Sequence, residues 1–413
     1  MLLRARIILP ITAPPIEDGA VRVNGNRVAG MGRWRDLAKH EAGPVRDLGE
    51  VVLMPGLVNA HCHLDYTDMA GRLAPTKSFP DWIKTITTYK ASWDYSEFAL
   101  SWLNGARMLL RSGTTTVADI EAVPELLPDV REATPLRVFS FLEMTGVKSR
   151  RAPETILAET VARIDALPAA RGGLGLSPHA PYSTTPALLR LCSHLARKRR
   201  WRIVSHVAES ETEFEMFRRG RGAMFDWLNR NERDMSDCGF CTPVRHLAQH
   251  CLLDSNLLAV HANYLDDGDL PLLANHGVHI VHCPRSHAYF GHRRFPLDEL
   301  RATGVNLCLG TDSLATTKKP RGRALELNLF TEMRALAAVE PGLDPEMILR
   351  MATINGARAL GLAGQIGEVS TGALADLIAV PQAGRSDEVA GAMVHFDGCV
   401  TGVMIDGQWA LTS

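Results

Sequence analysis

Short apolar runs alternate with longer amphipathic segments through the middle of the chain. Eight runs rich in β-branched and other apolar residues lie near residues 57–63, 114–119, 136–141, 173–179, 202–206, 257–261, 278–282 and 305–312. Most of the intervals between them show the period of an amphipathic helix, as in residues 98–111, 153–167 and 185–199. Strands that alternate with helices pair in parallel, so this pattern predicts the α/β class and a closed (β/α)8 barrel of the TIM type. An open, doubly wound sheet is the alternative.

The two ends of the chain have a different pattern, with strand-like segments and turn residues but little helical periodicity. The strand-like segments are residues 4–9, 20–23, 375–380 and 401–407. We therefore expect a small composite β-sandwich domain made of residues 1–54 and 365–413. The barrel domain is expected to span residues 55–364.

Two connections that follow predicted strands are long, residues 64–98 and 210–254. Both contain several aromatic residues. Long insertions after barrel strands usually lie over the mouth of the barrel, so we expect these two connections to form a lid.

Residues that can bind metals or carry protons recur at the carboxyl ends of the predicted strands. They are His61, His63, His179, His206, Glu209, His261 and Asp312. An open sheet would gather such residues only near the point where its strand order reverses, whereas a closed barrel delivers every strand end to one mouth. Their spread along the chain therefore favours the closed barrel.

Four of these residues have the chemistry of a metal site. His61 and His63 are two residues apart on a predicted strand, so both imidazoles point to the same face. Alone, such a pair is usually two hydrogen-bonded histidines, but His206 and Asp312 would add a third imidazole and a carboxylate. Three histidines and one aspartate leave a position for water, which distinguishes a catalytic metal site from a structural one. The metal would lower the pKa of that water towards about 7, giving hydroxide near neutral pH.

Glu209 and His261 are candidates for proton transfer beside this site. Glu209 lies three residues after His206, where the strand gives way to a loop, and suits protonation of a substrate ring nitrogen. His261 could stabilise charge that develops at the attacked carbon. Taken singly, Glu209 is better explained as a solvent-facing carboxylate and His261 as a core histidine, so the assignment depends on their occurring together.

Composition excludes several classes of protein. The 413 residues carry a formal net charge of -1, which argues against nucleic-acid and membrane-surface partners. We find no apolar stretch of membrane-spanning length and no signal-peptide layout at the start, so we expect a cytoplasmic protein. The eight scattered cysteines are expected to be reduced thiols, and the single CxxC at Cys238 and Cys241 is weak evidence for a metal or redox site.

Several motifs together resemble those of the amidohydrolase superfamily, in its branch of cytosine deaminases, triazine hydrolases and S-adenosylhomocysteine deaminases. They are residues 55–63, 179–183, 206–209, 261–263 and 310–313, and the resemblance covers nearly the whole chain. It implies that His61, His63, His206 and Asp312 bind one divalent metal, with zinc expected and iron or manganese as alternatives.

The resemblance also implies roles in the reaction. Glu209, His261 and Asp312 would handle protons, and His179 would contact the substrate. Relatives with two metals carry a bridging lysine on the fourth strand. Residues 175–179 contain none, which favours a single metal.

For the substrate, the resemblance implies an aminated nitrogen heterocycle, in particular an adenosine-type nucleoside. Residues 79–82 and His287 are similar to sequences of aminodeoxyfutalosine deaminases. Trp82 is a candidate for stacking on a ring or for lid packing, and Arg285 for binding a carboxylate or for a loop-fixing salt bridge. The basic segment 313–321 is either a solvated loop or a contact for an anionic substrate tail.

Alternatives remain open at this stage. A triazine or other chlorohydrolase, or a hydrolase of cyclic amides or imines, would use the same ligands on a different bond. A non-catalytic scaffold on the same fold is the alternative of another class, although such proteins typically lack metal ligands. The resemblance leaves a homodimer open.

Overall fold

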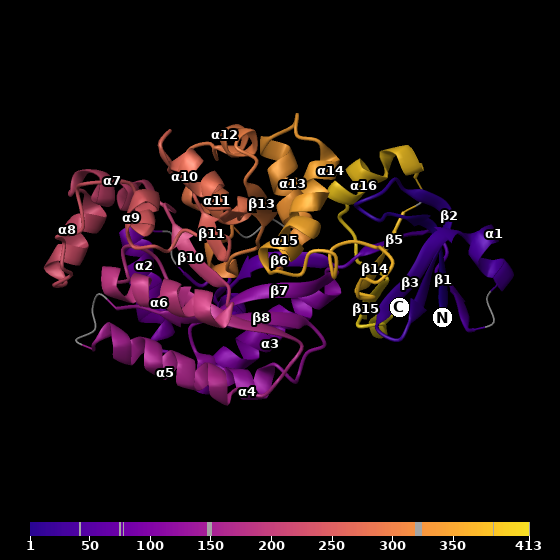
Figure 1. The fold of residues 1–413 in the computed structure, drawn as a ribbon, viewed down its shortest axis with the longest axis horizontal. Helices are drawn as coiled ribbons and strands as arrows, with labels where there is room; N and C mark the ends of the chain where they lie inside the picture. Colours follow the sequence, from indigo (N-terminus) through magenta and orange to yellow (C-terminus); the bar gives the residue numbers. More distant parts are fainter. Residues whose placement is uncertain are drawn as a thin grey trace.

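The computed structural model describes residues 1–40, 43–73, 76, 78–146, 151–318, 324–382 and 384–412. At its centre is a sheet of eight parallel strands (Figure 1). The strands are β6 (Leu57–Cys62), β7 (Thr114–Glu121), β8 (Arg137–Met144), β9 (Gly172–Pro178), β10 (Ile203–Val207), β11 (Leu257–His261), β12 (His279–His282) and β13 (Asn306–Leu309). Each lies on or next to one of the eight apolar runs in the sequence.

The sheet closes on itself almost completely. Neighbouring strands pair in the order of the sequence from β6 to β13. A parallel bridge between Cys62 and Asp312 then brings the segment after β13 to the end of β6. The prediction of a (β/α)8 barrel is therefore confirmed, and the open sheet is wrong.

The barrel strands are apolar along most of their length because both of their faces are buried. Inward-facing residues from different strands, including Val58, Phe141, Val204 and Val260, form one core cluster. The outer faces pack against helices in a larger cluster that includes the fully buried Trp102. Parallel sheets require this covering on both sides.

Helices cover the outside of the barrel (Figure 1). Those on or near it are α3 (Tyr95–Arg111), α4 (Leu127–Val130), α5 (Pro153–Ala166), α6 (Pro186–Arg199), α10 (Asp269–Asn275), α11 (Pro284–Phe290), α12 (Leu297–Ala302), α13 (Leu329–Val339), α14 (Pro345–Met351), α15 (Ile354–Ala359) and α16 (Val389–Val394). Helix α3 begins earlier than the apolar period predicts because Asp94 and Glu97 form a capping box that adds a turn.

A second eight-stranded sheet combines both ends of the chain. Its strands are β1 (Leu2–Ile8), β2 (Ile16–Asn24), β3 (Arg27–Arg33), β4 (Val45–Asp47), β5 (Val51–Pro55), β14 (Leu377–Pro381), β15 (Gly402–Ile405) and β16 (Gln408–Thr412). The short helix α1 (Trp34–Leu37) follows β3. Strand β5 lies between β1 and β14, so the sheet joins the two ends. The composite β domain is confirmed, while the boundaries proposed at 54/55 and 364/365 stay predictions.

The two long connections lie over the mouth of the barrel. The first contains α2 (Phe79–Lys90), and the second contains α7 (Glu211–Arg219), α8 (Ala223–Arg230) and α9 (Pro243–Gln249). They meet in an apolar cluster in which Phe79 and Trp82 from the first pack with Phe217 and Trp227 from the second. Across the described ranges, no helix combines the length and the apolarity needed to cross a bilayer.

Candidate active site at the mouth of the barrel

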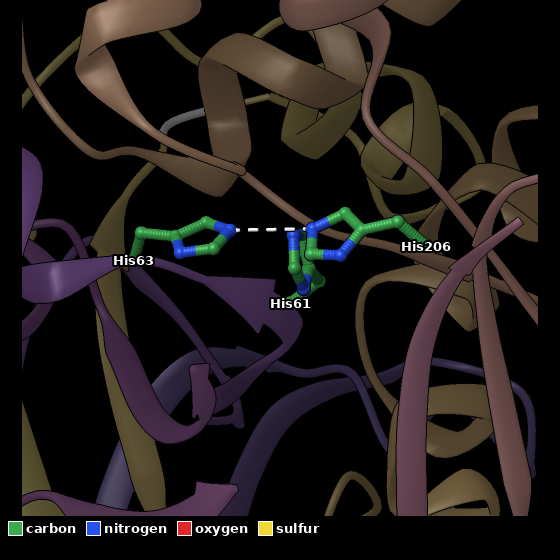
Figure 2. Close-up of side chains that lie close together, drawn as sticks. All are labelled: His61, His63 and His206. Carbon is green, nitrogen blue, oxygen red and sulfur yellow. Dashed lines mark hydrogen bonds between the residues drawn. The ribbon is translucent and has the colours of Figure 1, made fainter. Parts of the chain in front are cut away.

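Three histidines meet at the carboxyl end of the barrel. His61 lies near the end of β6, His63 follows that strand directly, and His206 lies in β10. Ligand nitrogens of the three rings all lie within 4.8 Å of one another. His63 Nε2 is 3.3 Å from His206 Nε2 (Figure 2). All three side chains are buried.

The donor chemistry of these histidines fits a divalent metal. His206 Nδ1 donates to the carbonyl oxygen of His179 at 3.0 Å, which leaves a lone pair on Nε2. Burial lowers the pKa of His206 to about 3, and burial together with His61 lowers the pKa of His63 well below its ordinary value. Both nitrogens of His61 and Nδ1 of His63 are buried and have no hydrogen-bond partner within the described chain. Buried imidazole nitrogens without hydrogen-bond partners are what a metal of this class requires.

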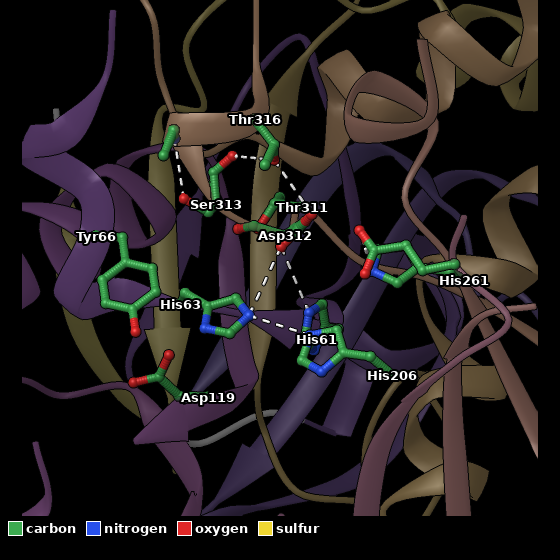
Figure 3. Close-up of polar contacts among 12 residues, drawn as sticks. His61, His63, Tyr66, Asp119, His206, His261, Thr311, Asp312, Ser313 and Thr316 are labelled. Atoms are coloured by element: carbon green, nitrogen blue, oxygen red, sulfur yellow. Dashed lines mark hydrogen bonds and ion pairs between the residues drawn. The ribbon is translucent and has the colours of Figure 1, made fainter. Parts of the chain in front are cut away.

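Asp312 adds a carboxylate at the same point. Its Oδ1 lies 3.6 Å from His61 Nε2 and 3.7 Å from His63 Nε2 (Figure 3). The backbone amide of Asp312 also donates to the carbonyl oxygen of His61 at 3.1 Å, which fixes the two segments relative to each other. Burial alone would raise the pKa of Asp312, but the surrounding His61, His261 and His63 hold it well below its ordinary value.

The backbone turns sharply where these residues leave their strands. Ala208, His261, Ala262 and Asp312 have φ values of 50°, 73°, 50° and 52°. Residues other than glycine rarely adopt this left-handed region, which costs of order 1 kcal/mol each. Such strain concentrates at functional sites, and here it bends several strand ends around one mouth.

Glu209 and His261 lie together beside the histidine cluster. Glu209 Oε1 is 3.5 Å from His261 Nε2, and both side chains are buried. Burial, followed by the charges of Asp312 and Glu213, raises the pKa of Glu209 well above its ordinary value. Burial lowers the pKa of His261. A carboxyl group with a raised pKa beside an imidazole with a lowered pKa is suited to proton transfer to or from a bound molecule.

Glu213 supports this arrangement and was not predicted from the sequence. Its carboxylate accepts hydrogen bonds from the backbone amides of Ala208 at 3.1 Å and Glu209 at 2.9 Å. It thus holds the turn that carries Glu209. The Ser210-x-x-Glu213 spacing, typical of a helix start, marks this residue in the sequence.

A cavity of about 550 Å³ opens at this point. Its lining includes His63, His206, Glu209, His261 and Asp312. The cavity therefore brings three of the four predicted metal ligands and the predicted proton carriers together in one space.

Two predicted substrate contacts, His179 and Trp82, also line the cavity. His179 Nδ1 lies 2.6 Å from Ser183 Oγ, and its ring centroid is 4.8 Å from that of His206. Trp82 comes from α2 and packs against Phe290, and its side chain also lines the cavity, while its contact with a substrate stays a prediction.

Arg285 is placed differently from the other predicted contacts. It does not line this cavity. Its Nε lies 2.5 Å from Oε1 of the fully buried Glu332, and its backbone amide donates to Glu332 Oε2 at 3.0 Å. The guanidinium is therefore used in the loop-fixing salt bridge that the sequence left open, and a substrate contact stays a prediction.

The CxxC gives no sign of a second metal centre. Cys238 and Cys241 are buried free cysteines, and burial raises the pKa of Cys238 to about 12 and also raises that of Cys241. Among the described residues, only His61, His63 and His206 satisfy the geometry of a metal-binding group. Of the basic segment 313–321, residues 319–321 lie outside the described residues.

Comparison with known proteins agrees with this site. The model of the amidohydrolase family matches residues 52–410. A 5-methylthioadenosine/S-adenosylhomocysteine deaminase of Syntrophobacter fumaroxidans is 34% identical over 379 residues, which cover 88% of this chain and 80% of the relative. An aminodeoxyfutalosine deaminase of Deinococcus radiodurans is 30% identical over 360 residues, covering 84% of this chain and 82% of the relative.

A solved structure supports the same relationship. An adenosine deaminase from Xanthomonas campestris with bound zinc superposes with a TM-score of 0.85 and 26% identity, covering 100% of this chain and 92% of that chain. The match of the family model over nearly the whole length, together with these relatives, shows that the chain belongs to the amidohydrolase family.

Proposed function

We propose that this chain is a metal-dependent hydrolytic deaminase that removes the amino group of an adenosine-type nucleoside. The observation that carries the proposal is the convergence of His61, His63, His206 and Asp312 on one point, beside a cavity that Glu209 and His261 line together with His63, His206 and Asp312. Relatives that match most of this chain are named as deaminases of such nucleosides.

His61, His63, His206 and Asp312 would hold one divalent metal. Zinc is the expected ion, because nitrogen and oxygen donors of this kind suit it and the related Xanthomonas campestris deaminase was solved with bound zinc. Iron and manganese are the alternatives. When bound, the metal supplies a water molecule that is nucleophilic near neutral pH.

The proton transfers are assigned to side chains of the chain itself. Asp312 accepts the proton of the attacking water at its carboxylate. Glu209, whose pKa is raised by burial, delivers a proton to the ring nitrogen beside the attacked carbon. His261 stabilises the charge that develops at that carbon. Asp312 then passes its proton to the departing ammonia, and the proton of the added hydroxyl returns to Glu209, so that the amino group is replaced by a carbonyl oxygen and both carboxyl groups regain their starting state.

The cavity lining supports a heterocyclic substrate. Trp82 and Tyr182 provide aromatic surfaces, and His179 provides a polar contact close to His206. At neutral pH His179 is uncharged, because burial lowers its pKa to about 3. It therefore suits a hydrogen bond to a neutral ring rather than an ion pair.

Ammonia release by the purified, metal-loaded protein tests the proposal. The panel is adenosine, 5′-methylthioadenosine, S-adenosylhomocysteine and aminodeoxyfutalosine, with cytosine and a chlorinated triazine as non-nucleosides. Turnover of the nucleosides supports the proposal. Chloride release from the triazine without deamination of any nucleoside would favour the chlorohydrolase, and inactivity on every compound would favour the scaffold.

A further inference from the structure

One buried arginine, Arg233, lies in the second long connection and takes no part in the proposed proton transfers. It follows α8, and its side chain is only 2% exposed. Helices α7, α8 and α9 of this connection lie at the end of the molecule away from the β domain (Figure 1). A buried guanidinium is costly unless its charge is compensated and its donors are used, so its partners show what it holds in place.

Asp237 compensates the charge of Arg233. Nη1 of Arg233 donates to Asp237 Oδ1 at 2.6 Å, and Nη2 donates to Oδ2 at 2.8 Å. A planar guanidinium forms such a bidentate pair with a carboxylate, and an ammonium group does not. Cys238 Sγ lies 3.3 Å from Nη1, and Cζ of Arg233 lies 5.7 Å from the centroid of the Phe217 ring. The guanidinium is therefore enclosed by residues of its own connection.

The remaining donors of Arg233 reach a different part of the chain. Nε donates to the carbonyl oxygen of Tyr182 at 3.1 Å, and Nη2 donates to that of Pro181 at 3.4 Å. These carbonyls are 51 and 52 residues away in the sequence, in the turn of residues 179–183 that follows β9. One side chain thus joins the second long connection to the 179–183 turn.

Both of the joined segments line the cavity. Tyr182 and Ser183 belong to the lining from the turn, and Trp227 and Leu228 belong to it from α8. The backbone amide of Arg233 donates to the carbonyl oxygen of Leu228 at 3.1 Å, so Arg233 is also fixed to the end of α8. The position of these two parts of the cavity wall relative to each other therefore depends on Arg233.

The 179–183 turn also carries the immediate neighbours of the His179 ring. Ser183 Oγ lies 2.6 Å from His179 Nδ1, and the ring centroid of Tyr182 lies 5.7 Å from that of His179 in an edge-to-face arrangement. A shift of the carbonyls that Arg233 holds would move both neighbours of this imidazole.

The groups assigned to metal binding and proton transfer are held in other ways. His206 lies within β10, and Glu213 holds the turn that carries Glu209. Loss of the guanidinium should therefore weaken substrate binding more than it slows the reaction of bound substrate.

We propose that Arg233 is a positioning residue that joins the second long connection to the 179–183 turn and thereby sets the substrate-binding wall of the cavity. This inference rests on the proposed function, because it concerns the binding of the same substrate. It also gives the segment around the CxxC a role, since Asp237 and Cys238 contact the guanidinium.

Arg233→Lys is the first test, because a lysine keeps the charge beside Asp237 but lacks the planar fork that reaches two carbonyls. We expect KM for the nucleoside to rise roughly tenfold or more, kcat to fall by less than about threefold and the metal content to stay the same. Arg218→Lys, an exposed arginine of the same connection that pairs with Asp266, is the matched control and should keep the wild-type KM. An unchanged KM in Arg233→Lys, or a loss of kcat alone, would overturn the proposal.

A double variant separates positioning from loss of stability. Arg233→Met combined with Asp237→Leu removes both charges, so that neither is left buried without its partner, and proteins often tolerate such a replacement. It still removes the donors to Pro181 and Tyr182, so KM should rise as in Arg233→Lys. A wild-type KM in the folded double variant would contradict the proposal, and Arg233→Lys decides alone if the double variant does not fold.

Hydrogen exchange separates this inference from the proposed function, because it needs no substrate. The Ser183 amide, which donates to the carbonyl oxygen of Ala180 at 3.1 Å, reports on the turn. Its exchange should be faster by roughly tenfold or more in Arg233→Lys, while exchange in the barrel strand β12 stays the same. Unchanged exchange at Ser183 would overturn the role of Arg233 even in an active deaminase. Faster exchange in a protein that releases no ammonia would mean that the proposed deamination, and not the anchoring of the turn, is wrong.

Discussion

Glu209 Oε1 lies 3.5 Å from His261 Nε2, and the two residues leave the ends of the adjacent parallel strands β10 and β11. Strand pairing sets this contact, since Val207 is the register partner of His261. The side-chain amide of Asn263 donates a hydrogen bond to the backbone carbonyl oxygen of Glu209 at 2.9 Å and connects the two turns. The pairing of the barrel strands therefore fixes the position of Glu209 relative to His261.

Glu209→Gln removes the proton that Glu209 delivers to the substrate ring. The variant should keep its metal, because Glu209 is not one of the predicted ligands, and lose roughly 10²- to 10⁴-fold in kcat. Steady-state kinetics with elemental analysis measure both quantities. Glu211→Gln, an exposed residue two positions away, is the control. Undiminished turnover by Glu209→Gln would remove the proton-transfer role.

Glu213→Ala tests whether the turn that carries Glu209 must be held. The substitution removes the acceptor for the amides of Ala208 and Glu209, so the Glu209 carboxyl is misplaced. We expect a fall in kcat of roughly 10- to 100-fold with little change in KM. Glu215→Ala, on the same helix but paired with Arg221, should behave as wild type. A rise in KM alone would indicate a substrate contact instead.

The barrel prediction succeeded because it depends on local periodicity and on strand ends. A run such as Leu57–Cys62 is buried on both faces, and this gives a continuous apolar segment that the sequence displays directly. His61 and His63 then share a face through the two-residue period of a strand. The convergence of His206 and Asp312 followed once the barrel was assumed to be closed.

Other parts of the site depend on tertiary contacts that no local sequence pattern predicts. Arg285 was left open between substrate and salt bridge, because its partner Glu332 is 47 residues away on α13. Lys90 and Glu143 also line the cavity; they come from segments on either side of α3, so their presence in one cavity follows only from the tertiary fold. The left-handed turn at Ala208 was also not predicted, since alanine carries no preference for it.

Arg137→Met should destabilise the junction between the barrel and the β domain. Arg137 Nη2 lies 3.1 Å from Asp376 Oδ2 and 2.7 Å from Asp406 Oδ1, and Asp376 is almost fully buried. Leaving that carboxylate uncompensated should lower the free energy of unfolding by about 3–5 kcal/mol. Arg4→Met, which removes exposed ion pairs with Asp18 and Asp47, should have a much smaller effect, because solvent screens both pairs. Equal losses in chemical denaturation would contradict this account.

His279 should make the fold sensitive to acid. Burial lowers its pKa from 6.5 to about 4, so protonation is disfavoured in the folded state. The contribution of neutral His279 to the free energy of unfolding is fully present above pH 6.5. It is lost as the pH falls towards 4, and the total loss reaches about 3 kcal/mol. His279→Gln can keep a hydrogen bond to Asn306 but does not titrate, so its stability should vary less over that range. Identical pH profiles of unfolding for both proteins would exclude this role.

Ammonia release from an adenosine-type nucleoside, before and after metal removal, tests the central claim most directly. Treatment with a chelator should abolish release, and one equivalent of zinc per chain should restore it, because His61, His63, His206 and Asp312 offer a single binding point. His206→Ala should not recover under the same conditions. Full ammonia release by protein shown to be free of metal would contradict the account.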